Sequence, residues 1–205
     1  MPIPRTLLAS LALLIAGSVA LSAATGGFQV FTTESARRAA VREKPIDVPA
    51  VALQTQSGAR ISLASLQGKW LLVDFIYTRC PTYCVALGAE FSQLQDRLAE
   101  PIAQGKVQLL SISFDPTHDT PAQLAAYLQR SRDRGDGWLA SRLLSAGDLL
   151  KLERAFGVTV IPDGFGGYIH NAAIHVVDPS GRLVEIFDLG DLDLVEQAVR
   201  QGLAQ

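Results

Sequence analysis

From residue 50 onward, the chain alternates between short apolar runs typical of β-strands and longer stretches with apolar residues at helical spacing. The apolar runs at residues 70–76 and 107–114 predict two buried strands. Between them, a stripe of leucine and phenylalanine at residues 87–98 predicts a helix. Residues 51–63 contain two short apolar runs around a glycine turn, which predicts a β-hairpin ahead of the first buried strand.

The second half of the chain continues this alternation. The predicted elements are a helix that opens at Thr120-Pro121, a helix at residues 146–156 ended by Gly157, a hairpin at residues 172–187 and a closing helix at residues 192–203. The order ββ-β-α-β-α-α-β-β-α predicts a parallel core with an antiparallel edge. We therefore expect an α/β fold of the thioredoxin-like type, with a central mixed sheet flanked by helices and an N-terminal β-hairpin.

The N-terminus has a different pattern. Residues 7–24 carry no charge and follow Arg5, which makes the stretch long for the apolar part of a signal peptide and just long enough to span a membrane. This favours an uncleaved single-span anchor, while the small residues at positions 22–24 leave a cleavage site open. Both alternatives send the rest of the chain across a membrane. No cysteine lies near this boundary, which excludes a lipoprotein anchor.

Three domains are predicted along the chain. Residues 1–25 form the membrane anchor or signal segment. Residues 26–45 form a linker or arm with a candidate short helix at residues 32–42, where a capping signal precedes alanines and arginines. Residues 46–205 form the thioredoxin-like domain.

Composition and charge narrow the range of partners. The 205 residues are 48% hydrophobic, and the net charge is −2 with a pI near 5.9. No basic tract is interleaved with aromatic residues. The chain therefore gives no electrostatic reason to expect nucleic-acid binding.

Cys80 and Cys84 are the two cysteines of the chain, and they lie between a predicted strand and a predicted helix. Residues four apart share one face of a helix, and a helix N-terminus lowers the pKa of nearby thiols. A structural disulfide across so short a loop would add little stability. The pair is therefore interpreted either as a redox dithiol or as two ligands of a metal site.

The chain has three histidines, and each could supply a third ligand. Two thiolates and one imidazole suit copper, which is soft when reduced and accepts nitrogen when oxidised. His118 lies in a polar loop and is expected to be a solvated turn residue. His170 follows a glycine-rich loop and His175 lies inside the next strand, so we expect them on opposite sheet faces. The loop position favours His170 as the ligand.

Three segments in order resemble the Sco/SenC family of copper-binding proteins, over about residues 46–200. They are Phe-x-Tyr-Thr-x-Cys-Pro-x-x-Cys at residues 75–84, Ser-Ile-Ser-Phe-Asp-Pro-x-x-Asp-Thr-Pro at residues 111–121 and His-x8-Pro-x-Gly at residues 170–181. The Cys-x3-Cys spacing distinguishes the chain from ordinary thioredoxins. The resemblance implies that copper, as Cu(I) or Cu(II), is bound by Cys80, Cys84 and His170.

The same resemblance implies a copper metallochaperone that helps assemble the binuclear copper site of cytochrome c oxidase subunit II. Another copper chaperone or a thioredoxin-like reductant would be a further partner. The implied location is the bacterial inner membrane, with the domain in the periplasm, or export after cleavage. The alternatives are a thiol-disulfide reductase that keeps the oxidase cysteines reduced and a copper-responsive signalling module.

Two departures from related patterns bear on these alternatives. Ile169 and Asn171 flank the histidine where the family often has an acidic residue, which leaves open the group that orients the imidazole. Thioredoxin-type oxidoreductases place a cis-proline before the late strand, and this chain has Ala172 there. The second departure argues against general thiol-disulfide exchange, so an enzymatic role is not the main expectation.

Overall fold

The computed structural model describes residues 4–28, 30–135 and 137–204, and the chain separates into two units, Met1–Glu43 and Lys44–Gln205. The ends of the predicted domains at residues 1–3 and 205 lie outside the described residues. The predicted limits at residues 25 and 45 stay predictions. We call Lys44–Gln205 the globular unit.

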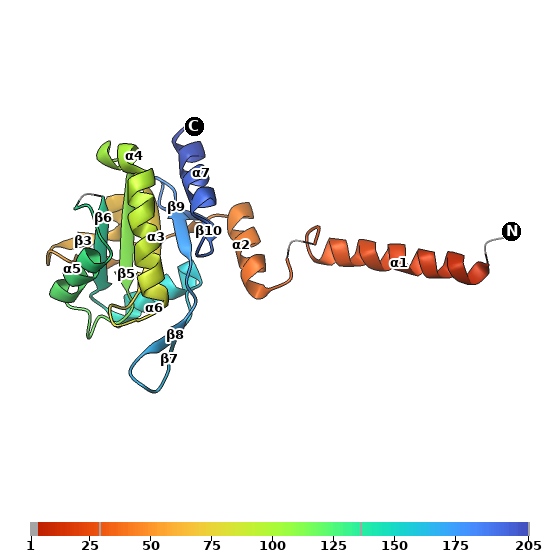
Figure 1. Cartoon of the computed structure of the whole chain (residues 1–205), viewed down its shortest axis with the longest axis horizontal. Helices are drawn as coiled ribbons and strands as arrows, with labels where there is room; N and C mark the ends of the chain where they lie inside the picture. The colour runs from red at the N-terminus through yellow and green to blue at the C-terminus, as the bar shows by residue number, and fades with distance from the viewer. Residues whose placement is uncertain (1–3, 29, 136, 205) are drawn as a thin grey trace. The chain divides into compact units, whose positions relative to one another are not determined.

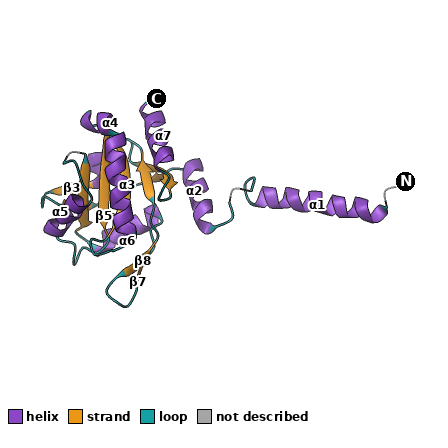
Figure 2. Cartoon of the chain, viewed as in Figure 1, coloured by secondary structure: helices purple, strands orange, loops and turns teal. Residues whose placement is uncertain are grey.

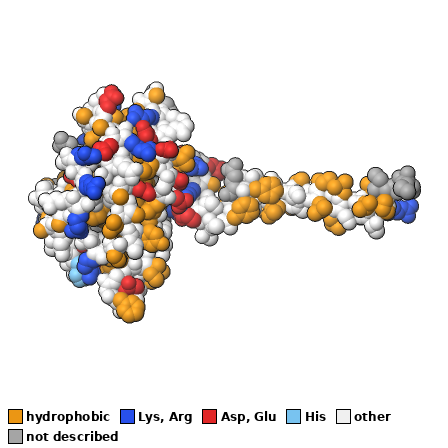
Figure 3. All heavy atoms as spheres, in the orientation of Figure 1, with side chains coloured by type: hydrophobic (Ala, Val, Ile, Leu, Met, Phe, Trp, Pro, Cys, Tyr) orange, Lys and Arg blue, Asp and Glu red, His pale blue; other side chains and the backbone are white. Residues whose placement is uncertain are grey.

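The described residues of the first unit form two helices, α1 (Arg5–Ala24) and α2 (Thr33–Glu43). Within the described residues, α1 is the one helix long and apolar enough to cross a membrane, a test that an N-terminal signal sequence also passes. Its side chains are mostly hydrophobic (Figure 3). The candidate short helix is confirmed as α2, where Thr32 and Ser35 cap the start through reciprocal hydrogen bonds of 3.1 Å.

The sheet of the globular unit has eight strands among the described residues, in the order β1-β10-β9-β4-β5-β6-β2-β3 (Figure 1). Their bounds are β1 Ile46–Asp47, β2 Ala52–Thr55, β3 Arg60–Ser62, β4 Trp70–Ile76, β5 Val107–Ser113, β6 Trp138–Leu143, β9 Ile174–Val177 and β10 Arg182–Phe187. Strands β4, β5 and β6 are parallel, and the remaining pairs are antiparallel. The mixed, thioredoxin-like sheet with its N-terminal hairpin β2–β3 is thus confirmed.

Helices cover both faces of this sheet. Their bounds are α3 Tyr83–Arg97, α4 Ala99–Ala103, α5 Pro121–Arg130, α6 Ala146–Phe156 and α7 Leu192–Leu203, with a 3-10 turn η1 at Leu63–Leu66. Phe91 of α3 packs on Trp138 at a ring distance of 5.5 Å, whereas Phe156 of α6 packs on Phe75 at 5.1 Å. Trp138 and Phe75 face opposite sides of the sheet by strand register. Helix α3 therefore lies in front of the sheet in Figure 1, with α6 behind it.

Strand β6 was not predicted, and the predicted order is wrong at that point. Its sequence, Trp-Leu-Ala-Ser-Arg-Leu, includes two polar residues. Ser141 is buried nonetheless, and Arg142 bonds the Gln54 side chain of β2 at 3.0 and 2.8 Å. Partners from two neighbouring strands satisfy these polar groups, so the strand depends on tertiary contacts. Strands β1, β7 (Val160–Pro162) and β8 (Tyr168–His170) were also missed.

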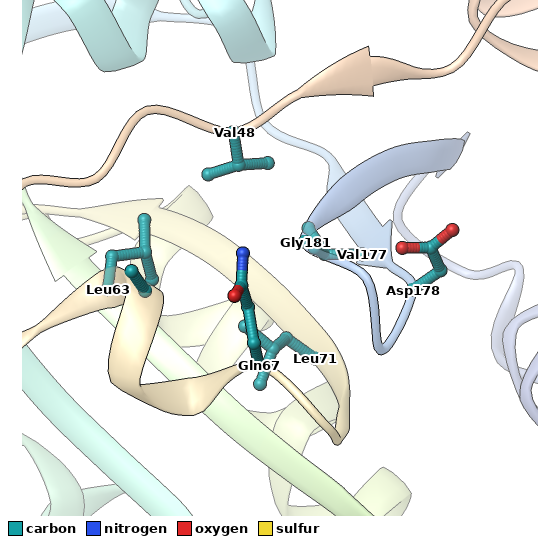
Figure 4. Close-up of a pocket in the computed structure, with 8 residues that line it drawn as sticks. Val48, Leu63, Gln67, Leu71, Val177, Asp178 and Gly181 are labelled. Atoms are coloured by element: carbon teal, nitrogen blue, oxygen red, sulfur yellow. The ribbon is translucent and has the colours of Figure 1, made fainter.

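The turn between β9 and β10 lies within the hairpin predicted at residues 172–187. Gly181 has a φ of +84°, and a Cβ there would lie 2.6 Å from Nε2 of Gln67. Figure 4 shows the Gln67 amide directed toward this turn, and it donates to the Ser180 carbonyl at 3.4 Å. This turn lies near the start of β4, because Val177 pairs with Leu71. It is therefore structural and lies away from the cysteines, which follow the end of β4.

Candidate metal centre

The two cysteines lie at the junction of β4 and α3. Cys80 is in the turn before the helix, and Cys84 is the second residue of α3. The backbone N–H of Cys84 donates to Sγ of Cys80 at 3.5 Å. The expectation that both would occupy one helix face is therefore wrong for Cys80, although the bent turn still brings the two sulfurs together.

His170 is the last residue of β8, which pairs with β7 in a small separate sheet (Figure 2). The predicted glycine-rich loop is therefore the turn of a β-hairpin. Asp163 organises that turn, because its Oδ1 accepts hydrogen bonds from the backbone N–H groups of Phe165 at 2.7 Å and Gly167 at 2.9 Å. The short strands give His170 a defined position that a loop would not give.

Cys80, Cys84 and His170 form one cluster, with their possible ligand atoms all within 4.8 Å of one another. Sγ of Cys84 lies 3.9 Å from Nε2 of His170. The three residues are 7%, 1% and 9% exposed. Two sulfurs and one imidazole nitrogen are the donor set that soft and borderline metal ions prefer. The sequence-predicted residues are thus brought together, and they fit a soft metal ion.

A backbone carbonyl orients the His170 ring. Nδ1 lies 3.1 Å from the carbonyl oxygen of Asn171, which suits an Nδ1–H donor and leaves Nε2 facing Cys84. The Asn171 side chain in turn accepts from the Thr159 N–H at 2.7 Å and donates to the Gly157 carbonyl at 3.0 Å. The sequence left open which group orients the imidazole. The structure shows that this group is the backbone carbonyl of Asn171.

Aromatic rings surround the imidazole. The ring centroids of Phe114, Tyr77 and Tyr83 lie 5.0, 5.9 and 6.1 Å from that of His170. Tyr168 adds edge contacts to Tyr77 at 5.2 Å and to Phe114 at 5.4 Å. These side chains limit access of water to Nε2 and lower the local polarity, which strengthens the interaction of a bound cation with its thiolates.

The two thiols differ in acidity. Burial opposes ionisation of Cys80, but the backbone N–H groups of Cys84 and Thr82 outweigh it and lower the pKa of Cys80 to about 6. Burial is also the largest effect on Cys84, and it raises the pKa of that thiol well above the usual range. The prediction that the helix N-terminus lowers thiol pKa values is therefore right for Cys80 and wrong for the deeper Cys84.

Two carboxylates that sequence reasoning missed hold the cysteine turn against the loop after β5. Asp119 is fully buried and accepts hydrogen bonds from the N–H of Thr78 at 3.0 Å, its hydroxyl at 2.6 Å and the Ser113 hydroxyl at 2.6 Å. Asp115 pairs with Arg79 at 2.8 Å. Both belong to the segment at residues 111–121, which resembles a motif of the Sco/SenC family. That resemblance was the sequence feature that could have pointed to them.

The other two histidines lie outside the cluster. The His118 side chain is 52% exposed and lies 2.8 Å from Asp115, in agreement with a solvated turn residue. His175 is 2% exposed and packs edge-on against Phe75 and Phe156. The expectation that His170 and His175 would face opposite sides of one sheet is wrong, because they belong to different sheets.

The sequence model of the family described as SCO1/SenC matches residues 41–201. The chain belongs to the SCO1/SenC family. The SCO1 protein homolog of Bacillus subtilis is 31% identical over 145 residues, which cover 69% of this chain and 74% of that protein. The chain spans about half to two thirds of the length of the mitochondrial SCO relatives that it matches.

Solved structures of this family agree with the fold. Bradyrhizobium japonicum ScoI with copper bound has a TM-score of 0.62 at 25% identity, over 76% of this chain and 98% of that one. BsSco has a TM-score of 0.68 at 26% identity, over 78% of this chain and 94% of that one. The latter is described as a member of the Sco family of cytochrome c oxidase assembly proteins with a disulfide switch. Its disulfide switch and the bound copper of ScoI are properties of those proteins.

Proposed function

We propose that this SCO1/SenC protein is a metallochaperone that binds one copper ion through Cys80, Cys84 and His170. The observation that carries the proposal is the convergence of two sulfurs and one imidazole nitrogen within 4.8 Å. Thiolates suit Cu(I), and the added imidazole suits Cu(II). Copper bound to the related ScoI supports the choice of metal.

The cargo would be delivered to the binuclear copper site of cytochrome c oxidase subunit II. The description of the related BsSco as a cytochrome c oxidase assembly protein supports the oxidase as recipient, and the choice of subunit II is part of the proposal. Few protein ligands at one end of the globular unit would let a partner's thiols displace them stepwise. Cys80, the more exposed of the two cysteines, would exchange first. His170, held by the hairpin, would keep the metal bound during the exchange.

Helix α1 would hold the protein in a bacterial inner membrane, with the globular unit in the periplasm. Its length and apolar composition support an anchor. The test is fractionation of cells that express the full chain with a C-terminal tag. A membrane-bound product of full-length mass is expected, whereas a soluble product cleaved near residue 24 would show a signal peptide instead.

Copper titration of the full chain in detergent tests the metal site. The reduced protein should bind one copper ion per chain, and the form with a Cys80–Cys84 disulfide should bind it weakly or not at all, because ligation needs thiolates. His170→Ala should weaken Cu(II) binding strongly, and His175→Ala should not. Equal binding by both redox forms would exclude the two-cysteine site, and loss of binding in His175→Ala alone would exclude His170.

A thiol-disulfide reductase is the second candidate, and the acidity of Cys80 favours it. A pKa of about 6 keeps this sulfur ionised at neutral pH, as an attacking thiol requires. Reduction would need the two cysteines and not the histidine. The response of oxidase assembly to His170→Ala therefore separates the two candidates.

A further inference from the structure

A groove runs from the two cysteines along the face of the globular unit between α3 and the segment that follows α5. Its volume is about 640 Å³, within the range of small-molecule sites, and Cys80 and Cys84 line one end of it. His170 is not among its lining residues. The thiols are therefore bordered by the histidine hairpin on one side and by this groove on the other.

Among the residues that the structure describes, the groove is lined by three arginines, Arg130, Arg132 and Arg134, and by one acidic residue, Asp96. Arg134 pairs with Asp96 at 2.6 Å. Neither Arg130 nor Arg132 forms an ion pair with any residue that the structure describes. Figure 3 shows basic side chains on this side of the unit. Among the described residues, the guanidinium groups of Arg130 and Arg132 thus have no acidic partner, and they line the same groove as the two thiols.

Arg130 lies close to the cysteine turn. Nη2 of Arg130 donates to the carbonyl of Thr78 at 3.4 Å, two residues before Cys80. On the α3 side, a Cβ at Gly88 would lie 2.4 Å from Oγ of Ser131, so the glycine permits the close approach. The hydroxyl of Tyr127 donates to the carbonyl of Cys84 at 3.3 Å.

Arg132 occupies a position that normally favours glycine. It is the second residue after α5 and has a φ of +63°, in the left-handed region that bulky residues rarely adopt. Backbone bonds from Arg132 N to Gln129 O and from Asp133 N to Leu128 O hold this turn at 3.1 and 3.0 Å. A strained non-glycine residue at the end of a helix points to a use for its side chain.

We propose that the groove binds a small thiol that carries carboxylates, of the glutathione class. The carboxylates would pair with Arg130 and Arg132, because guanidinium groups recognise carboxylates through paired hydrogen bonds. The thiol would then lie beside Cys80. An extended tripeptide is roughly 10 Å long, shorter than the roughly 16 Å of α3 that borders the groove from Val85 to Asp96.

This inference deepens the proposed function, since it concerns the same two working thiols, and it assigns a reductant for them. The thiolate of a first ligand attacks Sγ of Cys80 in the Cys80–Cys84 disulfide. The S–S bond breaks, and the Cys84 thiolate takes a proton from solvent. A second ligand thiolate attacks the mixed disulfide, which releases the Cys80 thiolate and the ligand disulfide. Two ligand thiols are oxidised and one protein disulfide is reduced.

The test compares reduction of the oxidised full chain in detergent by glutathione and by 2-mercaptoethanol, which has no carboxylate. Wild type should prefer glutathione after correction for the acidity of the free thiols. The double variant Arg130→Ala/Arg132→Gly should lose about 10-fold of this preference, as expected for two ion pairs of about 0.7 kcal/mol each. Glycine suits the backbone of residue 132, so this change preserves the turn.

The matched control is Arg154→Ala, which removes one exposed arginine from α6 on the other face of the sheet. It should keep the preference for glutathione. A second readout is binding of S-methylglutathione to the reduced protein, followed by amide chemical shifts. The expected shifts lie along α3 and residues 130–134, and added salt should weaken the binding.

Copper titration of the same variants separates this proposal from the proposed function. One copper ion per chain in the double variant, together with loss of the glutathione preference, supports the groove. An unchanged preference would overturn the groove proposal whatever the copper result. If a long acidic peptide but not glutathione bound in the groove, the groove proposal would also be overturned, because the groove would then be a protein-docking surface.

Discussion

At the scale of single residues, Asp119 is the link between the loop after β5 and the turn that carries Cys80. It is fully buried and accepts three hydrogen bonds, two of them from Thr78. Hydrogen bonds from three donors offset the cost of burying this polar side chain. Its loss would leave those donors buried without a partner and would free the cysteine turn.

Asp119→Ala should therefore lower the free energy of unfolding by about 3 kcal/mol. It should also weaken copper binding, because the turn no longer holds Cys80 in place. Urea unfolding and copper titration measure the two effects. The control is Asp193→Ala, whose side chain is 91% exposed, and the expected change there is within about 0.5 kcal/mol. A fully stable Asp119→Ala variant would contradict this account of the turn.

Asp74 is a second buried carboxylate, in the middle of β4. Burial raises its pKa to about 7, against the opposing effect of Ser111. The folded state therefore holds its proton more tightly than the unfolded state, where the pKa is near 3.8. The stability associated with this proton is complete below pH 3.8 and is lost as the pH rises through about 7.

Asp74→Asn should remove this pH dependence. The free energy of unfolding of the variant, relative to wild type, should rise between about pH 4 and pH 7 and level off above pH 7. Urea unfolding at several pH values measures the difference. Asp47→Asn, on the exposed strand β1, is the control and should follow wild type. A constant difference across this interval would mean that folding does not raise the pKa of Asp74.

Among the site residues, sequence alone could predict those with distinctive chemistry. Cys80, Cys84 and His170 are of rare types and occupy recognisable spacings. The supporting groups could not be assigned roles, because a buried aspartate such as Asp119 has the same sequence appearance as a solvated one. The raised pKa of Cys84 could not be predicted from the sequence either, because it follows from burial of the thiol in the folded protein.

At the scale of elements, strands that depend on tertiary contacts were missed, and elements with an apolar pattern of their own were predicted. Strand β4 and helix α7 have apolar patterns of their own, and their predicted bounds were correct. Strand β6 needs Gln54 of β2 for its arginine, and β8 needs its partner β7. Elements whose polar groups are satisfied by distant neighbours give no local signal.

The hairpin β7–β8 yields a prediction, because Asn171 joins its base to the end of α6. Asn171→Ala removes the bonds to Thr159 and Gly157 and should increase the dissociation constant for Cu(II) about 10-fold. Copper titration measures this, and hydrogen exchange should show faster opening of the hairpin amides. The control, Asp163→Ala, loosens the far turn and should have a smaller effect on copper. Unchanged affinity in Asn171→Ala would mean that backbone pairing alone positions His170.

At the scale of the whole molecule, the site exists only in the finished fold. Cys84 and His170 are 86 positions apart, and the sheet brings the end of β4 and the hairpin before β9 to the same end of the globular unit. No short segment carries all three ligand atoms. Metal binding should therefore depend on the global fold, and changes in copper loading in cells must be interpreted together with protein abundance.

The two candidate functions make opposite predictions for one substitution in living cells. A dithiol suffices for disulfide reduction, so a reductase should tolerate His170→Ala. A copper donor needs the third ligand, because two thiolates without an imidazole do not hold oxidised copper in a stable site. A strain that carries His170→Ala at normal abundance should therefore lose copper loading of its oxidase, and added copper should restore it at least in part.

Cys80→Ser and Cys84→Ser are the reference variants for this experiment, because both candidate functions need both sulfurs. Oxidase activity and the copper content of purified oxidase are the measurements. His175→Ala, in the core beside Phe75, controls for loss of any histidine. Full oxidase assembly with His170→Ala, together with failure in either cysteine variant, would favour the reductase. Failure in all three, with rescue of His170→Ala by copper, would favour the copper donor, because added copper supplies metal and leaves a missing reductant unreplaced.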